Sequence, residues 1–323
     1  MTYAACFLAE ISPEKSAAGR LPDGVAIFFR SARLELVDRS DVIYRAAAAA
    51  CPTHEHDDSS SDADTATGDE DDPPPVVVIP QLGDLRRTLM SNEGGALLAL
   101  LRLVGSGAQV CCVSTHLWHE PSRPDVRCMQ VLLLSAALRR LLQRAGPGTG
   151  VVVCGDFNSE PAVAPGATGG GVYELLSSGC LRTDHADHPV AKGTAQGMPD
   201  LRCKKMHSAY AQAGWVRASL PRPPGFCHLP SLVLFVNARS PVHRPQEPIC
   251  TMTDHRGERC LDYLWLGGAA ELIRTLRMPF GAPRIGGCAG TAAGFSRVPN
   301  WQWPSDHLAI GAEVMLPMRH GDE

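Results

Sequence analysis

The sequence predicts a layered α/β domain, and three features carry that prediction. Apolar, β-rich segments recur along the chain, one long stretch has helical periodicity, and a Gly-Ser-Gly turn joins two of the segments. With 323 residues, 44% of them hydrophobic, the chain can bury a full core. A strand, a hairpin, a helix and a further strand in this order favour sheets packed against helices.

Sheet is predicted from the beginning of the chain. Gly24 to Arg30 is short, apolar and β-rich, and Leu34 to Val37 follows after a polar gap, so we expect two adjacent strands. His54 to Pro75 is acidic, Ser-rich and closed by prolines. Such a segment cannot bury enough apolar surface to offset the entropy lost on ordering, so it predicts a disordered insertion in preference to a partner motif.

The next segments predict a β-hairpin. Ala96 to Val104 and Gln109 to Thr115 are apolar, and they flank the glycines of Gly105 to Gly107. We expect this hairpin to place His116 at the end of a strand.

An amphipathic helix and a buried strand should follow. Ser122 and Pro124 stand where a helix cap and a first-turn proline belong, and apolar residues then recur at helical spacing until Gly146. Val151 to Cys154 is a continuous apolar run that stops at Gly155, as a buried strand does.

The last third of the chain is less regular. Proline and glycine are dense between residues 214 and 248, where we expect an insertion or long loop with the apolar run Leu232 to Val236 inside it. Order resumes at Cys260 to Leu266, and His307 to Leu316 is the predicted last strand. We therefore expect one domain over residues 1–323, interrupted at 54–75 and 214–248.

Composition narrows the functional classes. A net charge of −4 argues against a globally basic nucleic-acid binder, although a local basic groove could still hold a phosphate chain. The twelve cysteines are scattered without a CxxC pair, so buried thiols are expected and a structural zinc site is not. No signal peptide or membrane-spanning run is visible, which predicts a soluble, intracellular and most simply cytoplasmic protein.

The segment GDFNS, Gly155 to Ser159, is the strongest chemical motif. Strand alternation would place Asp156 and Asn158 on the same side at the edge of the sheet. A carboxylate can accept a water proton or hold a divalent cation, and an amide can donate to a phosphate oxygen. The alternative is an Asx-rich turn, which is common after strands.

Three further segments carry candidate residues. SDHLAI offers Asp306 as a metal ligand and His307 as an imidazole, unless the pair is merely exposed. Asp262 interrupts the apolar run CLDYLW, and a buried carboxylate needs a partner, for which His307 is the natural choice. STHLW places His116 at a strand end, facing either a site or solvent.

The order THL, GDFNS, LDY, SDH resembles the endonuclease/exonuclease/phosphatase superfamily over residues from about Gly24 to Val314. Within it the chain resembles the branch of CCR4-type deadenylases, nocturnin, Angel and 2',5'-phosphodiesterases. The segments that carry this resemblance are DGVAIFF (Asp23 to Phe29), THLWHEP, DVRCMQ, GDFNSEP, the run Asp184 to His188, CLDYLWL and PSDHLAI. The resemblance implies a four-layer α/β sandwich, in which two mostly antiparallel sheets are flanked by helices.

The resemblance also implies a role for each matched residue. Asp156 would orient or deprotonate the attacking water, and Asn158 would contact the scissile phosphate. His307 would stabilise the pentacovalent state, with Asp262 holding its tautomer.

His116 would bind phosphate, and Asp306 would join Asp156 in the metal site. Because these ligands are hard oxygens, Mg²⁺ is expected, with Mn²⁺ as an alternative. Trp118 could line a nucleotide groove by stacking, as could Trp301 or Trp303, although aromatic residues more often belong to the core.

One part of the family pattern is missing. An early Asn and a metal-binding Glu normally precede the segment matched by DGVAIFF, and the acids upstream of Asp23 are only Glu10 and Glu14. We expect either a truncated chain that lacks N-terminal strands or a degenerate member, and in both cases weak or no Mg²⁺-dependent activity.

The leading functional hypothesis is a 3'-5' exoribonuclease acting on poly(A) or 2',5'-oligoadenylate RNA, with nucleoside 5'-monophosphates as products. A nucleotide phosphatase of the same fold is one alternative. An inactive RNA-binding or scaffold protein is the other.

Overall fold

A computed structural model describes residues 2–10, 23–51, 83–91, 94–161, 170–213, 232–234, 247, 251–254, 257–276 and 305–317. The segment 54–75 and the tryptophans Trp301 and Trp303 lie outside these residues, as does most of 214–248.

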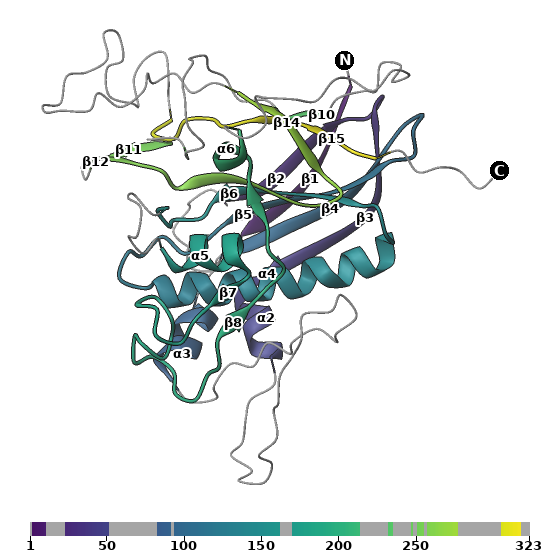
Figure 1. The fold of residues 1–323 in the computed structure, drawn as a ribbon. Helices are drawn as coiled ribbons and strands as arrows, with labels where there is room; N and C mark the ends of the chain where they lie inside the picture. Colours follow the sequence, from purple (N-terminus) through teal and green to yellow (C-terminus); the bar gives the residue numbers. More distant parts are fainter. Residues whose placement is uncertain are drawn as a thin grey trace, which may run out of the picture.

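A six-stranded sheet forms the centre of the fold (Figure 1). Its strand order is β3-β4-β5-β6-β13-β9, and every neighbouring pair is antiparallel except β5 and β6. Because parallel neighbours need a crossover connection, the helix between β5 and β6 is a requirement of this topology. The strands are β3 (Leu34–Ile43), β4 (Gly95–Leu103), β5 (Gln109–His116), β6 (Gly150–Asp156), β13 (Asp262–Gly268) and β9 (His207–Ser208).

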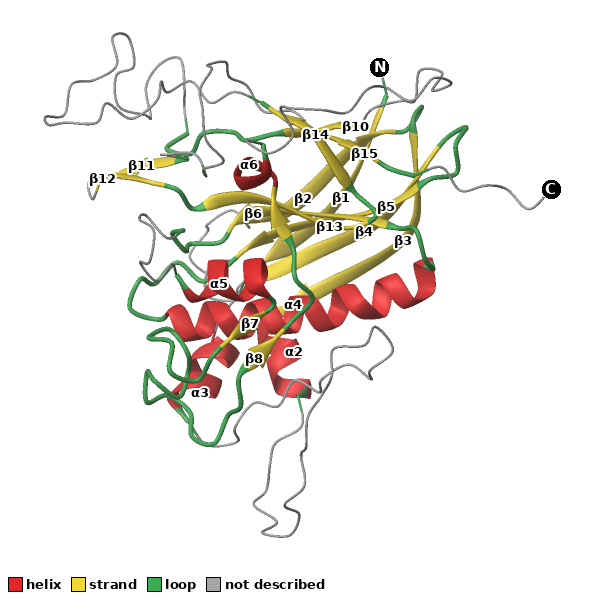
Figure 2. Cartoon of the chain, viewed as in Figure 1, coloured by secondary structure: helices red, strands yellow, loops and turns green. Residues whose placement is uncertain are grey.

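Helices cover one face of this sheet (Figure 2). The crossover helix α4 (Pro124–Ala145) begins at the predicted proline and ends at Gly146, so the sequence prediction is confirmed. The predicted hairpin is also confirmed, because β4 pairs antiparallel with β5. The same face carries α2 (Tyr44–Ala50), α3 (Asp84–Ser91) and α5 (Gly171–Ser178), whereas the short α6 (Ala209–Gln212) lies on the other face and packs with the small sheets.

Two smaller sheets pack on the opposite face. One pairs β1 (Tyr3–Glu10) with β2 (Asp23–Arg30), and the other has the order β10-β15-β14. Strand β4 separates two apolar clusters, with Leu98 in the cluster on the helix side and Leu97 in the cluster with the small sheets. The bounds of the second sheet are β10 (Leu232–Leu234), β14 (Glu271–Thr275) and β15 (Ala312–Met315).

Three expectations need correction. Residues 24–30 and 34–37 are not paired neighbours, because β2 pairs with β1 whereas β3 pairs with β4 and continues to Ile43. The expected loop at 214–248 contains β10, whose run Leu232–Leu234 pairs with the last strand. That last strand begins at Ala312, and His307 precedes it in an isolated bridge to Met252.

Two antiparallel strand pairs stand outside these sheets. They are β7 (Cys180–Leu181) with β8 (Leu201–Arg202), and β11 (Met252–Asp254) with β12 (Gly257–Arg259). The α/β architecture with two packed sheet layers and a helical layer is therefore confirmed. A helical layer over the small sheets is not found among the described residues.

The prediction of buried thiols is confirmed in part, because Cys111 and Cys112 are buried whereas Cys154 is half-buried. Cys111, Cys112 and Cys154 lie within strands, and every cysteine in the described part of the chain is a free thiol. Burial raises the pKa of Cys112 to about 12, so this thiol stays protonated at neutral pH. In the described ranges, no helix is both long and apolar enough to cross a bilayer.

Candidate active site

Three candidate residues stand at the ends of adjacent central strands. Asp156 ends β6, His116 ends the parallel neighbour β5, and these two residues are register partners. On the other side of β6, Asp262 begins antiparallel β13 and is also the register partner of Asp156. The sheet thus brings together residues that are up to 146 positions apart, as follows from their numbers 116 and 262.

The glycine of GDFNS is required by a close approach of two strands. Gly155 has φ +151°, and a Cβ built on it would lie 1.9 Å from the carbonyl oxygen of Thr115. A side chain at this position would push β6 away from β5. The glycine therefore keeps Asp156 beside His116.

The sequence predicted that strand alternation would place Asn158 beside Asp156. The structure places Asn158 there through a turn. Strand β6 ends at Asp156, and Asn158 has φ +48°. Its backbone N–H donates to Oδ1 of Asp156 at 2.8 Å, and its Nδ2 donates to the Leu117 carbonyl at 3.0 Å. The Asx turn and the clustered site are thus the same feature.

His307 joins the cluster from the segment before β15. Its Nδ1 lies 2.9 Å from Oδ2 of Asp262, and its Nε2 lies 3.8 Å from Oδ2 of Asp156. His116 Nε2 approaches the same Asp156 oxygen to 3.6 Å. Pairwise contacts of 2.9 to 3.8 Å therefore link Asp156, Asp262, His307 and His116 at the rim of the sheet, and Asn158 lies beside Asp156.

The charges in this cluster are coupled. The hydrogen bond to Asp262 raises the pKa of His307 to about 9, against the opposing effect of its burial. Burial, followed by repulsion from Asp262, raises the pKa of Asp156, although both histidines and the Asn158 N–H favour its ionised form. A cationic imidazole thus stands beside a carboxylate of raised proton affinity, an arrangement found at catalytic sites.

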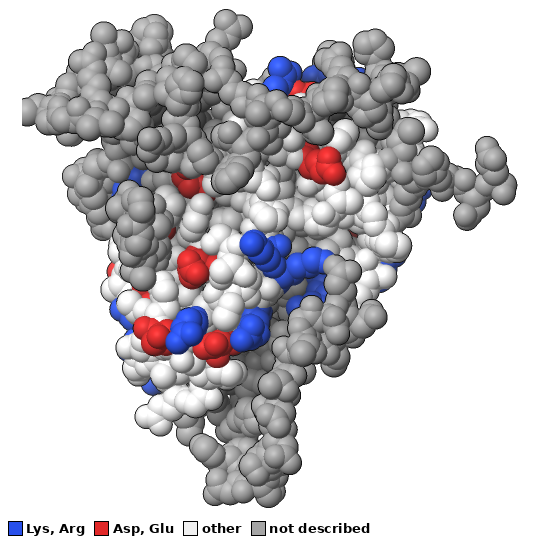
Figure 3. Space-filling model, viewed as in Figure 1, with Lys and Arg blue, Asp and Glu red and all other residues white. Residues whose placement is uncertain are grey.

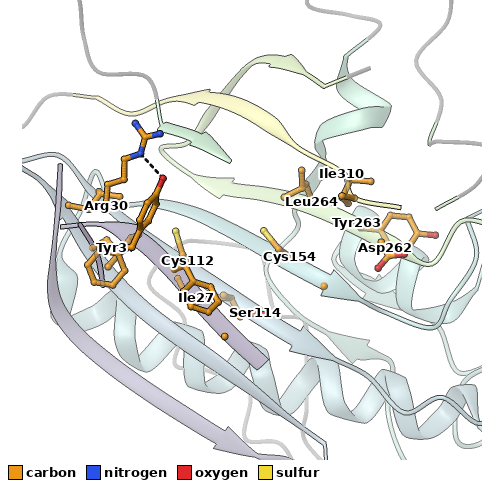
Figure 4. A pocket seen from close by; sticks show the side chains of 18 of the residues that line it. Tyr3, Ile27, Arg30, Cys112, Ser114, Cys154, Asp262, Tyr263, Leu264 and Ile310 are labelled. Carbon is orange, nitrogen blue, oxygen red and sulfur yellow. Dashed lines mark hydrogen bonds between the residues drawn. The ribbon is translucent and has the colours of Figure 1, made fainter. Parts of the chain in front are cut away.

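A cavity of about 990 Å³ opens from this cluster (Figure 4). Asp262 and His307 line one end, and Arg30 and Tyr3 line the other, where the Arg30 Nε donates to the Tyr3 hydroxyl at 3.3 Å. Between them the walls are mostly apolar and include the side chain of Cys112. Asp262 and His307, two residues of the polar cluster, thus border a water-accessible space.

Two predicted site residues lie less centrally. Trp118 is half-buried against the helix-side core, and its ring packs 5.0 Å from that of His119. Asp306 is exposed and close enough to His307 to help raise its pKa. Among the described residues, no three His, Cys, Asp or Glu side chains gather closely enough to hold a metal ion. The donor set at hand is therefore incomplete for Mg²⁺, which prefers six ligands.

Sequence reasoning did not find every residue that shapes the site. Thr251 is fully buried and accepts hydrogen bonds from the backbone of Asp262, and the Tyr263 hydroxyl donates to the Ser159 carbonyl at 2.8 Å. Thr251 follows the irregular segment 214–248, and no periodic sequence pattern includes it. In the Asp184–His188 run, His188 is fully buried and holds its own loop through Val190 and Pro199.

The fold is a mixed α/β fold in which a polar cluster stands at the rim of the central sheet. The family model described as the Endonuclease/Exonuclease/phosphatase family matches residues 3–307, and the chain belongs to that family.

Relatives of known activity share part of this sequence. Mouse 2',5'-phosphodiesterase 12 is 23% identical over 195 residues, which cover 60% of this chain and 28% of that protein. The CCR4-Not complex 3'-5'-exoribonuclease subunit Ccr4 of Yarrowia lipolytica is 25% identical over 268 residues, or 74% of this chain and 30% of that protein. The chain thus spans less than a third of the length of either relative.

Solved structures agree in fold. The human nocturnin catalytic domain superposes with a TM-score of 0.52 at 18% identity, covering 98% of this chain and 73% of that one. ANGEL2, described as a 2',3'-cyclic phosphatase, gives a TM-score of 0.56 at 17% identity, covering 97% and 75%. At these identities the likeness concerns the fold alone.

Proposed function

We propose that this chain hydrolyses phosphodiester bonds of RNA from the 3' end and releases nucleoside 5'-monophosphates, with poly(A) or 2',5'-linked oligoadenylate as substrate. The observation that carries the proposal is the convergence of Asp156, Asp262 and His307 at one rim of the sheet. The names of the relatives, a 2',5'-phosphodiesterase and a 3'-5' exoribonuclease, support the substrate class.

The chemistry assigned to the residues is an in-line displacement. Asp156 accepts a proton from water as the water oxygen attacks phosphorus, a role suited to a carboxylate of raised pKa. The bond from phosphorus to the 3' or 2' oxygen breaks, and that oxygen takes up a proton as it leaves. The phosphate remains on the 5' oxygen of the released nucleotide.

His307 and its neighbours stabilise the charge that develops on phosphate. The imidazolium donates Nδ1–H to Asp262 at 2.9 Å, so its Nε2–H is free to donate toward a phosphate oxygen near Asp156. His116, whose side chain is 58% exposed, lies 3.6 Å from Asp156 and can contact the incoming phosphate. Asn158 keeps one amide proton for the same purpose, because its other bond is to Leu117.

Mg²⁺, with Mn²⁺ as substitute, is the proposed cofactor. Asp156 and Asp306 are the carboxylates that we assign to it. Among the described residues, no group of three His, Cys, Asp or Glu side chains completes the site, so the ion would supply Lewis-acid stabilisation of the phosphate only with further ligands. Its contribution is tested by chelation in the assay below.

Surface charge is consistent with local and not global recognition of RNA. On the face shown in Figure 3, one group of Lys and Arg side chains lies near the centre, and acidic and basic side chains alternate below it. Exposed pairs such as Arg182 with Asp184 neutralise each other, at 3.1 Å. Substrate binding should therefore depend on salt only moderately, since few phosphates are neutralised.

The test is a single-turnover cleavage assay with protein in excess, so that slow cleavage is detected. The substrates are 5'-labelled oligo(A) and 2',5'-oligoadenylate, each in Mg²⁺ and in EDTA. We expect slow stepwise shortening from the 3' end, release of AMP, loss of activity in EDTA, and loss in Asp156→Ala. Asp184→Asn, a surface carboxylate paired with Arg182, is the control and should cleave like the wild type.

Product analysis separates the alternatives. Release of inorganic phosphate from a small nucleotide, without shortening of either oligonucleotide, would replace the proposal by a nucleotide phosphatase. RNA binding that persists in EDTA without any cleavage in Mg²⁺ or Mn²⁺ would indicate an inactive binding protein.

A further inference from the structure

A single buried threonine links the segments that carry Asp262 and His307. Thr251 has no exposed surface, and it lies where the β11–β12 hairpin, the start of β13 and the segment before β15 meet. Its backbone N–H donates to the Arg259 carbonyl at 2.8 Å, which closes the hairpin.

The side chain of Thr251 fixes the start of β13. Its Oγ1 accepts the backbone N–H groups of Leu261 at 2.9 Å and Asp262 at 3.0 Å. Leu261 immediately precedes β13, and Asp262 is the first residue of that strand. A buried N–H needs an acceptor, so this hydroxyl determines where the backbone of Asp262 lies.

The backbone of Thr251 fixes the segment that carries His307. Its carbonyl accepts the N–H of Leu308 at 2.6 Å, and the adjacent Met252 forms a bridge with His307. One residue thus holds both the main chain of Asp262 and that of the segment carrying His307. The side-chain hydrogen bond between Asp262 and His307, at 2.9 Å, closes the ring of contacts.

We propose that Thr251 is a positioning residue for the reaction, which sets the register of Asp262 against His307 through its hydroxyl. The inference rests on the proposed function of this site, but its structural part can be measured without turnover. Thr251 does not reach the substrate, so its effect passes through the two residues that it aligns. A misplacement of about 1 Å far from the reacting atoms can lower a rate by about 100-fold.

The kinetic test compares three variants. Thr251→Val keeps the shape and removes the acceptor, and we expect the single-turnover rate at saturating protein to fall about 10- to 100-fold, with the half-saturating concentration changed less than about 3-fold. Thr251→Ser keeps the hydroxyl and should restore the rate to within about 3-fold of the wild type. Thr149→Val alters a buried threonine at the far end of β6, bonded to Gly146, and should leave the rate unchanged.

The structural test uses amide hydrogen exchange in the substrate-free chain. Leu261 and Asp262 should lose protection in Thr251→Val and keep it in Thr251→Ser and Thr149→Val. If wild-type cleavage is absent, the proposed function fails, while this exchange pattern still supports or overturns the alignment by Thr251.

Three outcomes would overturn the inference. They are a wild-type rate in folded Thr251→Val, a Thr251→Ser variant that melts normally but cleaves as poorly as the valine variant, and unchanged protection of Leu261 and Asp262. If the valine variant does not fold, the serine variant decides, because the hydroxyl alone should preserve both rate and protection.

Discussion

The imidazole of His307 and the carboxylate of Asp262 are joined by a 2.9 Å hydrogen bond although they are 45 positions apart in the chain. A carboxylate only accepts, so His307 Nδ1 is the donor and Nε2 is turned toward Asp156, 3.8 Å away. Orientation of one imidazole by a partly buried carboxylate is the relationship on which the proposed chemistry depends.

This pair predicts a pH dependence of stability. The pKa of His307 is raised from 6.5 to about 9 in the folded chain, so its contribution to stability is fully present below about pH 6.5 and is lost as pH rises through about 9. In EDTA, the free energy of unfolding measured with urea should fall more between pH 6 and pH 9.5 in the wild type than in Asp262→Asn. Parallel curves for the two proteins would show that the pair contributes nothing.

Removing the charge of Asp156 should stabilise the fold. Burial and repulsion from Asp262 raise its pKa, so the ionised side chain is unfavourable in the folded state. Asp156→Asn should be about 0.5–2 kcal/mol more stable than the wild type at pH 8 in EDTA, and should lose cleavage. A variant that is less stable would mean that the two neighbouring histidines more than compensate for burial.

Gly155 should tolerate no side chain. Its φ of +151° and the 1.9 Å approach of the Thr115 carbonyl predict that Gly155→Ala costs about 2–4 kcal/mol and displaces Asp156. Gly148, with φ +77° and nothing within 4 Å, is the matched control, and Gly148→Ala should cost about 1 kcal/mol. Equal losses in urea unfolding would remove the argument for a close contact at Gly155.

Side chains on the two faces of β4 should contribute about equally to the stability of the fold. Leu97 packs with the small sheets and Leu98 with the helices, and both are fully buried. Each change to Ala should cost about 2–5 kcal/mol, whereas Val104→Ala, at a site 57% exposed, should cost under about 1 kcal/mol. A small loss at Leu97 alone would show that the small sheets do not cover the central sheet.

Turn residues and apolar periodicity predicted the elements that depend on residues close together in the sequence. The hairpin around Gly105 to Gly107 and the helix that begins at Pro124 follow from turn chemistry and periodicity, and both were correct. The partners of β2 and β3 could not be read in this way, because strand pairing depends on contacts distant in sequence. The polar gap between these strands marks a change of sheet and not a hairpin.

The candidate site shows the same division. Motif order and resemblance marked Asp156, Asp262 and His307 as candidates. The sheet register pairs Asp156 with Asp262, and a side-chain hydrogen bond joins His307 to Asp262. In the prediction from sequence, an Asx-rich turn at GDFNS was the alternative to a functional site. In the structure that turn is what places Asn158 beside Asp156. The role of Thr251 was not predicted, because a single buried threonine in an irregular segment forms no recognisable sequence pattern.

The most direct measurement of the central claim is a crystal structure of the chain with bound adenosine 5'-monophosphate. The account predicts that the phosphorus lies at the rim of the sheet, with a phosphate oxygen within hydrogen-bond distance of His307 Nε2 and Asp156 beside it. A nucleotide phosphate bound elsewhere on the molecule, with the site around Asp156 and His307 empty, would contradict it.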